Sequence, residues 1–227
     1  LLVFRACRCS LTVPTSVRSL RVVMAQRVAV TGTENVTHFE LDGRKNTVTA
    51  CPSLRELEFT DSVLSDRLPL HNASSLSTLK VTAKVIAPTF HFPSGLTSLV
   101  LHVVDEDFDF ALLTPLTTLR RLVFGFYTPD KEDYTLGSRD RDCVQITSVS
   151  DLPRSLVECH FALETDVDFT PLTNLTWLDL TLEEDLRLTF PTQLRKLEIH
   201  GAALGKTNIA DVALETFVSP ESVPLTR

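Results

Sequence analysis

Apolar residues recur along the chain in a short pattern, L-x-x-L-x-L, with apolar first, fourth and sixth positions. The copies begin at positions 17, 36, 54, 76, 96, 119, 156, 175 and 194, so neighbouring copies lie 18 to 23 residues apart, except for one interval of 37. The apolar residues of the nine copies are Val17, Leu20 and Val22; Val36, Phe39 and Leu41; Leu54, Leu57 and Phe59; Leu76, Leu79 and Val81; Leu96, Leu99 and Leu101; Leu119, Leu122 and Phe124; Leu156, Cys159 and Phe161; Leu175, Leu178 and Leu180; Leu194, Leu197 and Ile199. A repeat of this length is typical of a solenoid.

Within each copy, the fourth and sixth positions lie on one face of a short strand, because side chains alternate along a strand. A single strand cannot bury that face, whereas stacked copies pair in parallel and share one core. Between the copies, Leu186, Leu188 and Phe190 alternate with polar residues, and frequent prolines exclude long helices. We therefore expect an all-β protein, a mostly β solenoid of about nine coils with a parallel sheet on its concave face and extended or irregular convex segments.

The repeats resemble those of the leucine-rich repeat family, in its irregular, short-repeat form, over about residues 13–201. The family's asparagine after the third leucine is absent from most copies, where Asp42, Thr60, Thr82 and Thr181 stand near that place. The resemblance therefore implies the architecture, a curved stack of repeats, and does not indicate a particular subfamily.

The spacing also predicts the organisation of the chain. We expect one solenoid domain over residues 1–227, with a C-terminal cap or tail at 202–227. The interval of 37 marks an insertion at about residues 127–150, which is rich in charged residues. This insertion is interpreted either as a solvated surface loop or as an arm that contacts a partner.

Composition narrows the function classes. Hydrophobic residues make up 43% and charged residues 22% of the chain, as in an ordinary folded protein. The net charge of -7 disfavours nucleic acid as a partner, because binding to phosphates needs a basic surface. No apolar run approaches the roughly 18–20 residues of a membrane span. The five cysteines are scattered without a C-x-x-C pair, which favours reduced thiols and an intracellular over a secreted or cell-surface location.

No motif in the chain predicts catalysis or a cofactor. The segment Gly201–Thr207 has three residues between its glycines, where a phosphate-binding loop has four, so we expect no nucleotide there. Glu40, Glu56 and Glu58 are expected to cluster on neighbouring coils as a solvated acidic patch rather than a metal site. We therefore expect no catalytic residue, no cofactor and no metal. The acceptor pattern for glycosylation occurs at Asn35, Asn72 and Asn174.

The third and fifth positions of each copy face away from the core and form two rows across the stack. The second half of these rows gathers apolar and aromatic residues with an arginine, the composition that carries interface energy. The expected partner-binding residues are Val100, Arg121, Val123, His160 and Trp177. The alternative is that Trp177 lies flat over its neighbours as ordinary packing.

These features favour a non-enzymatic module that binds another protein on the concave face of the solenoid. Two alternatives remain open at this stage. The repeats could serve as a structural spacer or surface-exposed ectodomain, or as the recognition part of a longer multidomain protein.

Overall fold

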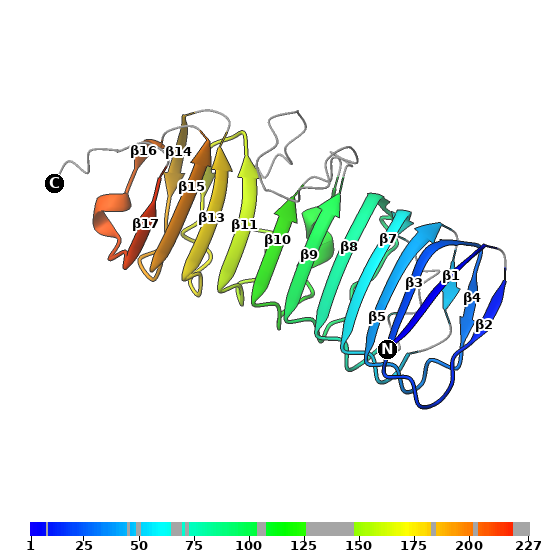
Figure 1. The fold of residues 1–227 in the computed structure, drawn as a ribbon. Helices are drawn as coiled ribbons and strands as arrows, with labels where there is room; N and C mark the ends of the chain where they lie inside the picture. The colour runs from blue at the N-terminus through cyan, green and yellow to red at the C-terminus, as the bar shows by residue number, and fades with distance from the viewer. Residues whose placement is uncertain are drawn as a thin grey trace. The chain divides into compact units, whose positions relative to one another are not determined.

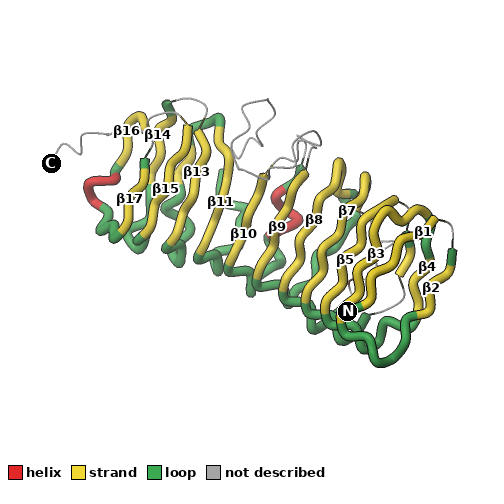
Figure 2. Tube along the Cα trace, in the orientation of Figure 1, coloured by secondary structure: helices red, strands yellow, loops and turns green. Residues whose placement is uncertain are grey.

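The computed structural model describes residues 1–7, 9–44, 46–48, 51–64, 70, 73–103, 108–125, 148–182, 185–201 and 204–219. Over these residues the chain is an all-β solenoid of about nine turns built on parallel sheet (Figure 1). It divides into two compact units, unit 1 over Leu1–Asp105 and unit 2 over Glu106–Arg227. Strands and loops account for almost all of the described chain, and helix is limited to short turns (Figure 2).

Unit 1 contains a main parallel sheet and a smaller sheet. The main sheet has the strand order β1 (Leu2–Cys7), β3 (Ser19–Gln26), β5 (His38–Arg44), β7 (Glu56–Leu64), β8 (Thr78–Ile86) and β9 (Ser98–Val103). The smaller sheet has the order β2 (Ser10–Thr12), β4 (Ala29–Thr31) and β6 (Thr47–Val48). Each coil thus contributes one long strand and, in some coils, one short strand from the opposite side.

Unit 2 repeats this plan. Its main parallel sheet has the order β10 (Arg121–Gly125), β11 (Glu158–Leu163), β13 (Trp177–Leu182), β15 (Lys196–Gly201) and β17 (Thr216–Val218). Its smaller sheet has the order β12 (Val167–Asp168), β14 (Leu186–Thr189) and β16 (Leu204–Thr207). Two short 3-10 turns, η2 (Phe110–Leu113) and η3 (Ile209–Asp211), complete the described elements.

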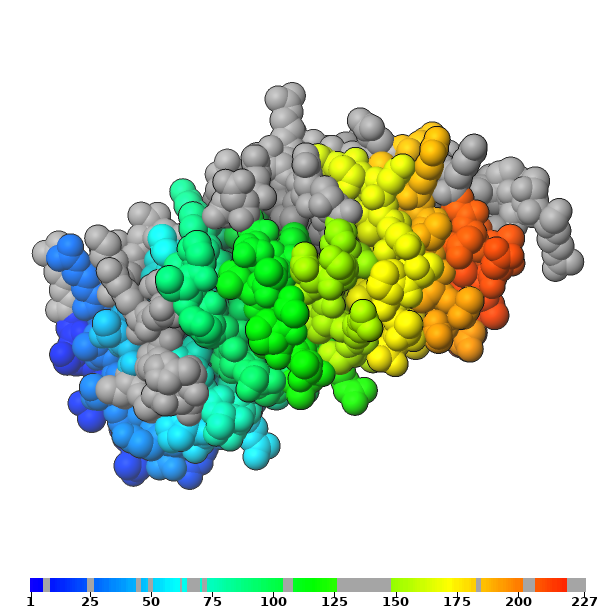
Figure 3. All heavy atoms as spheres, turned by 180° about the vertical axis from the view of Figure 1, so that it is seen from behind, coloured from blue at the N-terminus to red at the C-terminus, as the bar shows by residue number. Residues whose placement is uncertain are grey.

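The repeated apolar residues form the core, as the sequence pattern predicts. All of them are buried except Val17, which is partly exposed. The fourth positions pair in register from strand to strand: in unit 1 Leu20, Phe39, Leu57, Leu79 and Leu99, and in unit 2 Leu122, Cys159, Leu178 and Leu197. Each residue of one coil therefore stacks on the equivalent residue of the next coil. Within each unit, the successive coils follow one another as bands of changing colour in the space-filling view (Figure 3).

Two outer strands extend the stack beyond residues 13–201. Strand β1 pairs with β3 so that Leu2 lies opposite Leu20, and β17 pairs with β15 so that Phe217 lies opposite Leu197. In the last copy the sixth position is Ser219 instead of an apolar residue. In these two strands the fourth positions, Leu2 and Phe217, are partly exposed, whereas the fourth positions of the nine copies are buried.

The segments opposite the main sheets are extended or irregular, as expected. Leu186 and Leu188 lie in β14 and are buried, whereas Arg187 between them and Thr189 after them are exposed. Residues 126–147, which include most of the 127–150 insertion, lie outside the described residues, as do 220–227 of the C-terminal tail. On either side of the insertion, β10 and β11 pair in register, with Arg121 opposite Glu158.

The described thiols of Cys9, Cys51 and Cys159 form no disulfide with one another. Cys51 and Cys159 are buried, and Cys9 is partly exposed. Burial raises the pKa of the Cys159 thiol well above its ordinary value, and the charge of Glu158 adds to this. Cys159 therefore behaves as a core residue.

No helix among the described residues has the length and hydrophobicity that a membrane span requires.

A carboxylate closes the turn after β12. One oxygen of Asp168 accepts hydrogen bonds from Thr170 N at 3.0 Å, from Thr170 Oγ1 at 2.8 Å and from Thr189 Oγ1 of the next coil. The hydrogen bond from Thr189, together with those from Thr170, lowers the pKa of Asp168 below its ordinary value despite some burial. The charged carboxylate therefore links two successive coils of unit 2.

We expect Asp168→Ala to lower the free energy of unfolding by about 1 kcal/mol at neutral pH, the usual net contribution of a hydrogen bond within a protein. Because the folded pKa is lowered, the carboxylate stabilises the protein above its ordinary pKa of 3.8, and this contribution is lost as the pH falls further. Urea unfolding at pH 7 and pH 3 measures the difference. The control is Asp185→Ala, which removes another exposed carboxylate of unit 2. Equal stability of the parent and Asp168→Ala at pH 7 would contradict the assignment.

Candidate functional site

The outer face of the unit 2 sheet, opposite its core, carries one continuous group of polar and aromatic side chains. Parallel pairing aligns Arg121, Glu158, Trp177 and Lys196 in one row across β10, β11, β13 and β15. A second row aligns Val123, His160, Asp179 and Glu198 on the same strands. We call these eight residues, with His200 at the end of β15, the unit 2 face.

Four of the five predicted partner-binding residues lie on the unit 2 face. Arg121 and Val123 come from β10, His160 from β11 and Trp177 from β13. Neighbouring strands of a sheet lie about 4.7–4.9 Å apart, so these side chains are adjacent. The fifth, Val100, lies in β9 of unit 1 and is partly exposed.

The expected exposure of this group is correct for Arg121 and Trp177 but wrong for Val123 and His160. The Arg121 side chain is 41% exposed and Trp177 is partly exposed, whereas Val123 and His160 are only 6% and 7% exposed. Val123 is short and pairs in register with the longer His160. His160 is enclosed by the side chains that it binds. Alternation along a strand sets the direction of a side chain, but its neighbours set its exposure.

His160 lies between two carboxylates. Its Nδ1 is 3.0 Å from Asp179 Oδ2 and its Nε2 is 2.7 Å from Glu158 Oε1. Burial alone would lower the pKa of His160, but the hydrogen bonds to Asp179 and Glu158, with their negative charges, outweigh it and raise the pKa above its ordinary value. Arg121 Nε donates to the same Glu158 oxygen at 2.8 Å. Through its two ring nitrogens, His160 therefore joins β10, β11 and β13 in one network with the two carboxylates and Arg121.

Trp177 is held from both sides. The His160 ring meets it edge-on, with 5.1 Å between ring centroids, and Lys196 Nζ lies 3.8 Å from the centroid of the indole ring. Both contacts come from neighbouring strands, β11 and β15. A cation over an indole face is an attractive contact, and it fixes the ring in place. The indole Nε1 is buried and has no hydrogen-bond partner.

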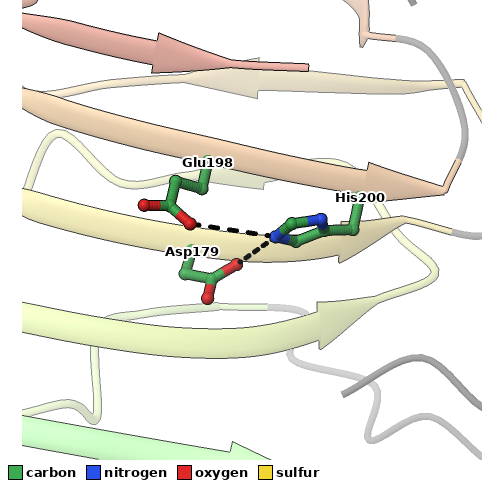
Figure 4. A group of neighbouring side chains, drawn as sticks. All are labelled: Asp179, Glu198 and His200. Carbon is green, nitrogen blue, oxygen red and sulfur yellow. Dashed lines mark ion pairs between the residues drawn. The ribbon is translucent and has the colours of Figure 1, made fainter. Parts of the chain in front are cut away.

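At one end of the face, a histidine meets two carboxylates (Figure 4). His200 Nε2 is 3.3 Å from Asp179 Oδ1 and 4.0 Å from Glu198 Oε2. Asp179 and Glu198 are fifth positions of their repeats and thus belong to one predicted row, whereas His200 lies outside the repeated pattern. The sequence does contain a pattern that could have indicated this group. Asp179 and Glu198 are 19 positions apart in successive repeats, and His200 follows Glu198 by two residues, on the same face of the strand.

The three glutamates expected to form an acidic patch on unit 1 have basic partners. Glu40 pairs with Arg21 at 2.8 Å, Glu58 with Lys80 at 2.7 Å and Glu56 with His38 at 3.5 Å. The side chains of these pairs are between 33% and 57% exposed. Exposed ion pairs of this kind contribute little to stability. The outer face of unit 1 is thus a charged, solvated surface.

Two other sequence motifs have structural roles in the described chain. Asn35 Nδ2 donates to Thr15 O at 3.1 Å, and Asn174 Nδ2 donates to Arg154 O at 2.9 Å, so each amide joins its coil to the preceding one. The third acceptor asparagine, Asn72, lies outside the described residues.

In the segment Gly201–Thr207, residues 204–207 form strand β16 beside β14. A phosphate-binding loop curls around its ligand, which an extended strand does not do. We therefore still predict that ATP and GTP do not bind at Lys206.

No family model matches the chain, and no curated protein is similar enough to it to count as a relative. The function is therefore argued from the geometry of the unit 2 face.

Proposed function

We propose that the chain is a leucine-rich repeat protein that binds another protein through the unit 2 face and catalyses no reaction. The solenoid of about nine turns supports the first part, because its buried residues follow the L-x-x-L-x-L pattern in register. Repeat solenoids characteristically use the surface of their stacked elements to bind extended partners.

The observation that carries the proposal is the fixed, partly exposed Trp177, which lies in the same row as Arg121 with Glu158 between them. Tryptophan and arginine are the residue types most enriched among residues that dominate binding energy. Contacts from His160 and Lys196 already order the indole ring, so binding costs less side-chain entropy than it would for a mobile ring. Arg121 is likewise ordered by its 2.8 Å contact with Glu158.

The charge arrangement of the face favours a partner with mixed polarity. Glu158, Asp179 and Glu198 each form an ion pair with at least one basic side chain of the face. Such a surface selects its partner by complementary charge and positions an aromatic contact at its centre.

We expect Trp177→Ala to weaken binding of a partner by about 30-fold, which corresponds to a loss of about 2 kcal/mol. The probe is a peptide selected from a random display library on the immobilised parent protein, with affinities measured by isothermal titration calorimetry. The matched control is Lys80→Ala, which removes a partly exposed, ion-paired residue from the outer face of unit 1.

Selected peptides that bind Trp177→Ala as tightly as the parent would contradict the proposal. So would a library that yields no binder at all, which is the result expected of a structural spacer. The Lys80→Ala control separates a specific loss from a general effect of altered surface charge.

A further inference from the structure

The three residues of the histidine and carboxylate group lie on two paired strands, and the two carboxylates occupy equivalent places. In β13 and β15, Asp179 lies opposite Glu198 and Thr181 lies opposite His200. Glu198 and His200 are two residues apart on one strand, so both face the side that Asp179 faces. The repeat itself therefore brings one imidazole and two carboxylates together.

In each carboxylate, one oxygen is occupied and the other is directed toward His200. Asp179 Oδ2 binds His160 Nδ1 at 3.0 Å, whereas Asp179 Oδ1 lies 3.3 Å from His200 Nε2. Glu198 Oε1 binds Lys196 Nζ at 2.6 Å, whereas Glu198 Oε2 lies 4.0 Å from His200 Nε2. His160 and Lys196 thus orient the two carboxylates from outside, as outer-shell residues do at metal sites.

A second observation concerns the inward oxygen of Asp179. The Asp179 side chain is 13% exposed, and its Oδ1 atom is buried without a hydrogen-bond partner. A buried carboxylate oxygen that accepts no hydrogen bond is costly. A cation bound between this oxygen and His200 would remove that cost.

We infer that Asp179, Glu198 and His200 bind a divalent transition-metal ion of the zinc type on the unit 2 face. The three ligand atoms lie within 4.8 Å of one another. Ligands at 2.0–2.2 Å from a tetrahedral zinc ion lie about 3.3–3.6 Å apart, so small side-chain movements complete the site. His200, with a 48% exposed side chain, is well placed to make them.

The donor set selects the class of metal. One imidazole nitrogen and two carboxylate oxygens suit zinc and related ions, whereas calcium takes six to eight oxygen ligands and magnesium retains most of its water. Three protein ligands leave a fourth position for water or for a group from another molecule. This inference goes beyond the proposed partner binding and does not depend on it.

The test is a titration of the metal-free protein with ZnCl₂ by isothermal titration calorimetry, with CoCl₂ as an optical probe of coordination geometry. The parent is expected to bind one Zn²⁺ through these residues, and His200→Ala to bind it at least about tenfold more weakly. The matched control is His38→Ala, which removes an equally exposed histidine, 3.5 Å from the single carboxylate of Glu56. This control retains the affinity of the parent.

All three proteins contain the same cysteines, so zinc held by thiols does not distinguish them. Because His200 is exposed, its variant is expected to fold, and circular dichroism verifies this. Absence of zinc binding to the parent would overturn the inference, as would equal affinity in His200→Ala. Displacement of Zn²⁺ by equimolar Mg²⁺ would overturn the choice of metal.

Discussion

Leu178→Ala lowers the free energy of unfolding by about 2–5 kcal/mol, the range for removing a buried leucine side chain. Leu178 is fully buried in β13, between Cys159 on one neighbouring strand and Leu197 on the other. The cavity left by the substitution lies inside a stack in which each coil depends on its neighbours. Urea unfolding followed by far-ultraviolet circular dichroism measures the loss.

The adjacent variant Trp177→Ala provides the control. Trp177 is partly exposed on the opposite face of the same strand, so its truncation is expected to cost well under the loss for Leu178→Ala. The comparison uses two large side chains one residue apart, and it therefore tests the strand register itself. Equal destabilisation by the two substitutions would mean that the assigned register is wrong.

The second large effect is expected at Gly32, where the chain leaves β4. Its φ of 74° lies in the left-handed region, and a Cβ there would be 2.6 Å from Val13 O. Gly32→Ala therefore combines an unfavourable backbone conformation with a collision against backbone, and we expect a loss of about 2–4 kcal/mol. The midpoint of thermal unfolding reports it.

Gly95→Ala is the matched control for this substitution. Gly95 lies outside the left-handed region, and a Cβ there would have its nearest contact at 3.5 Å, an ordinary separation. Alanine at such a position restricts the unfolded chain, so the stability of this variant should be unchanged or slightly higher. If Gly32→Ala were as stable as Gly95→Ala, the turn after β4 would have a different conformation.

The sequence was sufficient to predict the fold because each repeat specifies a register. A shift of one residue would turn Leu178 and Leu180 outward and bury Trp177 and Asp179 instead, so only one register buries the apolar residues. The same reasoning identified the direction of Arg121 and Trp177. It missed β17, where Ser219 stands at the sixth position of the motif, and β1, where only the fourth and sixth positions, Leu2 and Phe4, are present.

The details of the site depend on contacts between strands, which alternation does not describe. His160 is buried because Glu158, two positions before it, and Asp179, 19 positions after it, both reach its ring. His200 joins Asp179 through the pairing of β13 with β15. These contacts depend on which side chains of neighbouring coils meet. The alternation of side chains along one strand does not predict them, whereas the paired strands of the structure show them.

The most direct measurement of the proposed function follows the indole N–H of Trp177 by nuclear magnetic resonance. The chain has one tryptophan, so a single signal reports on the centre of the unit 2 face. During titration with the selected peptide, this signal is expected to shift in proportion to the bound fraction determined by calorimetry. A peptide that binds fully while the Trp177 signal stays unchanged would contradict the assignment of partner binding to this face.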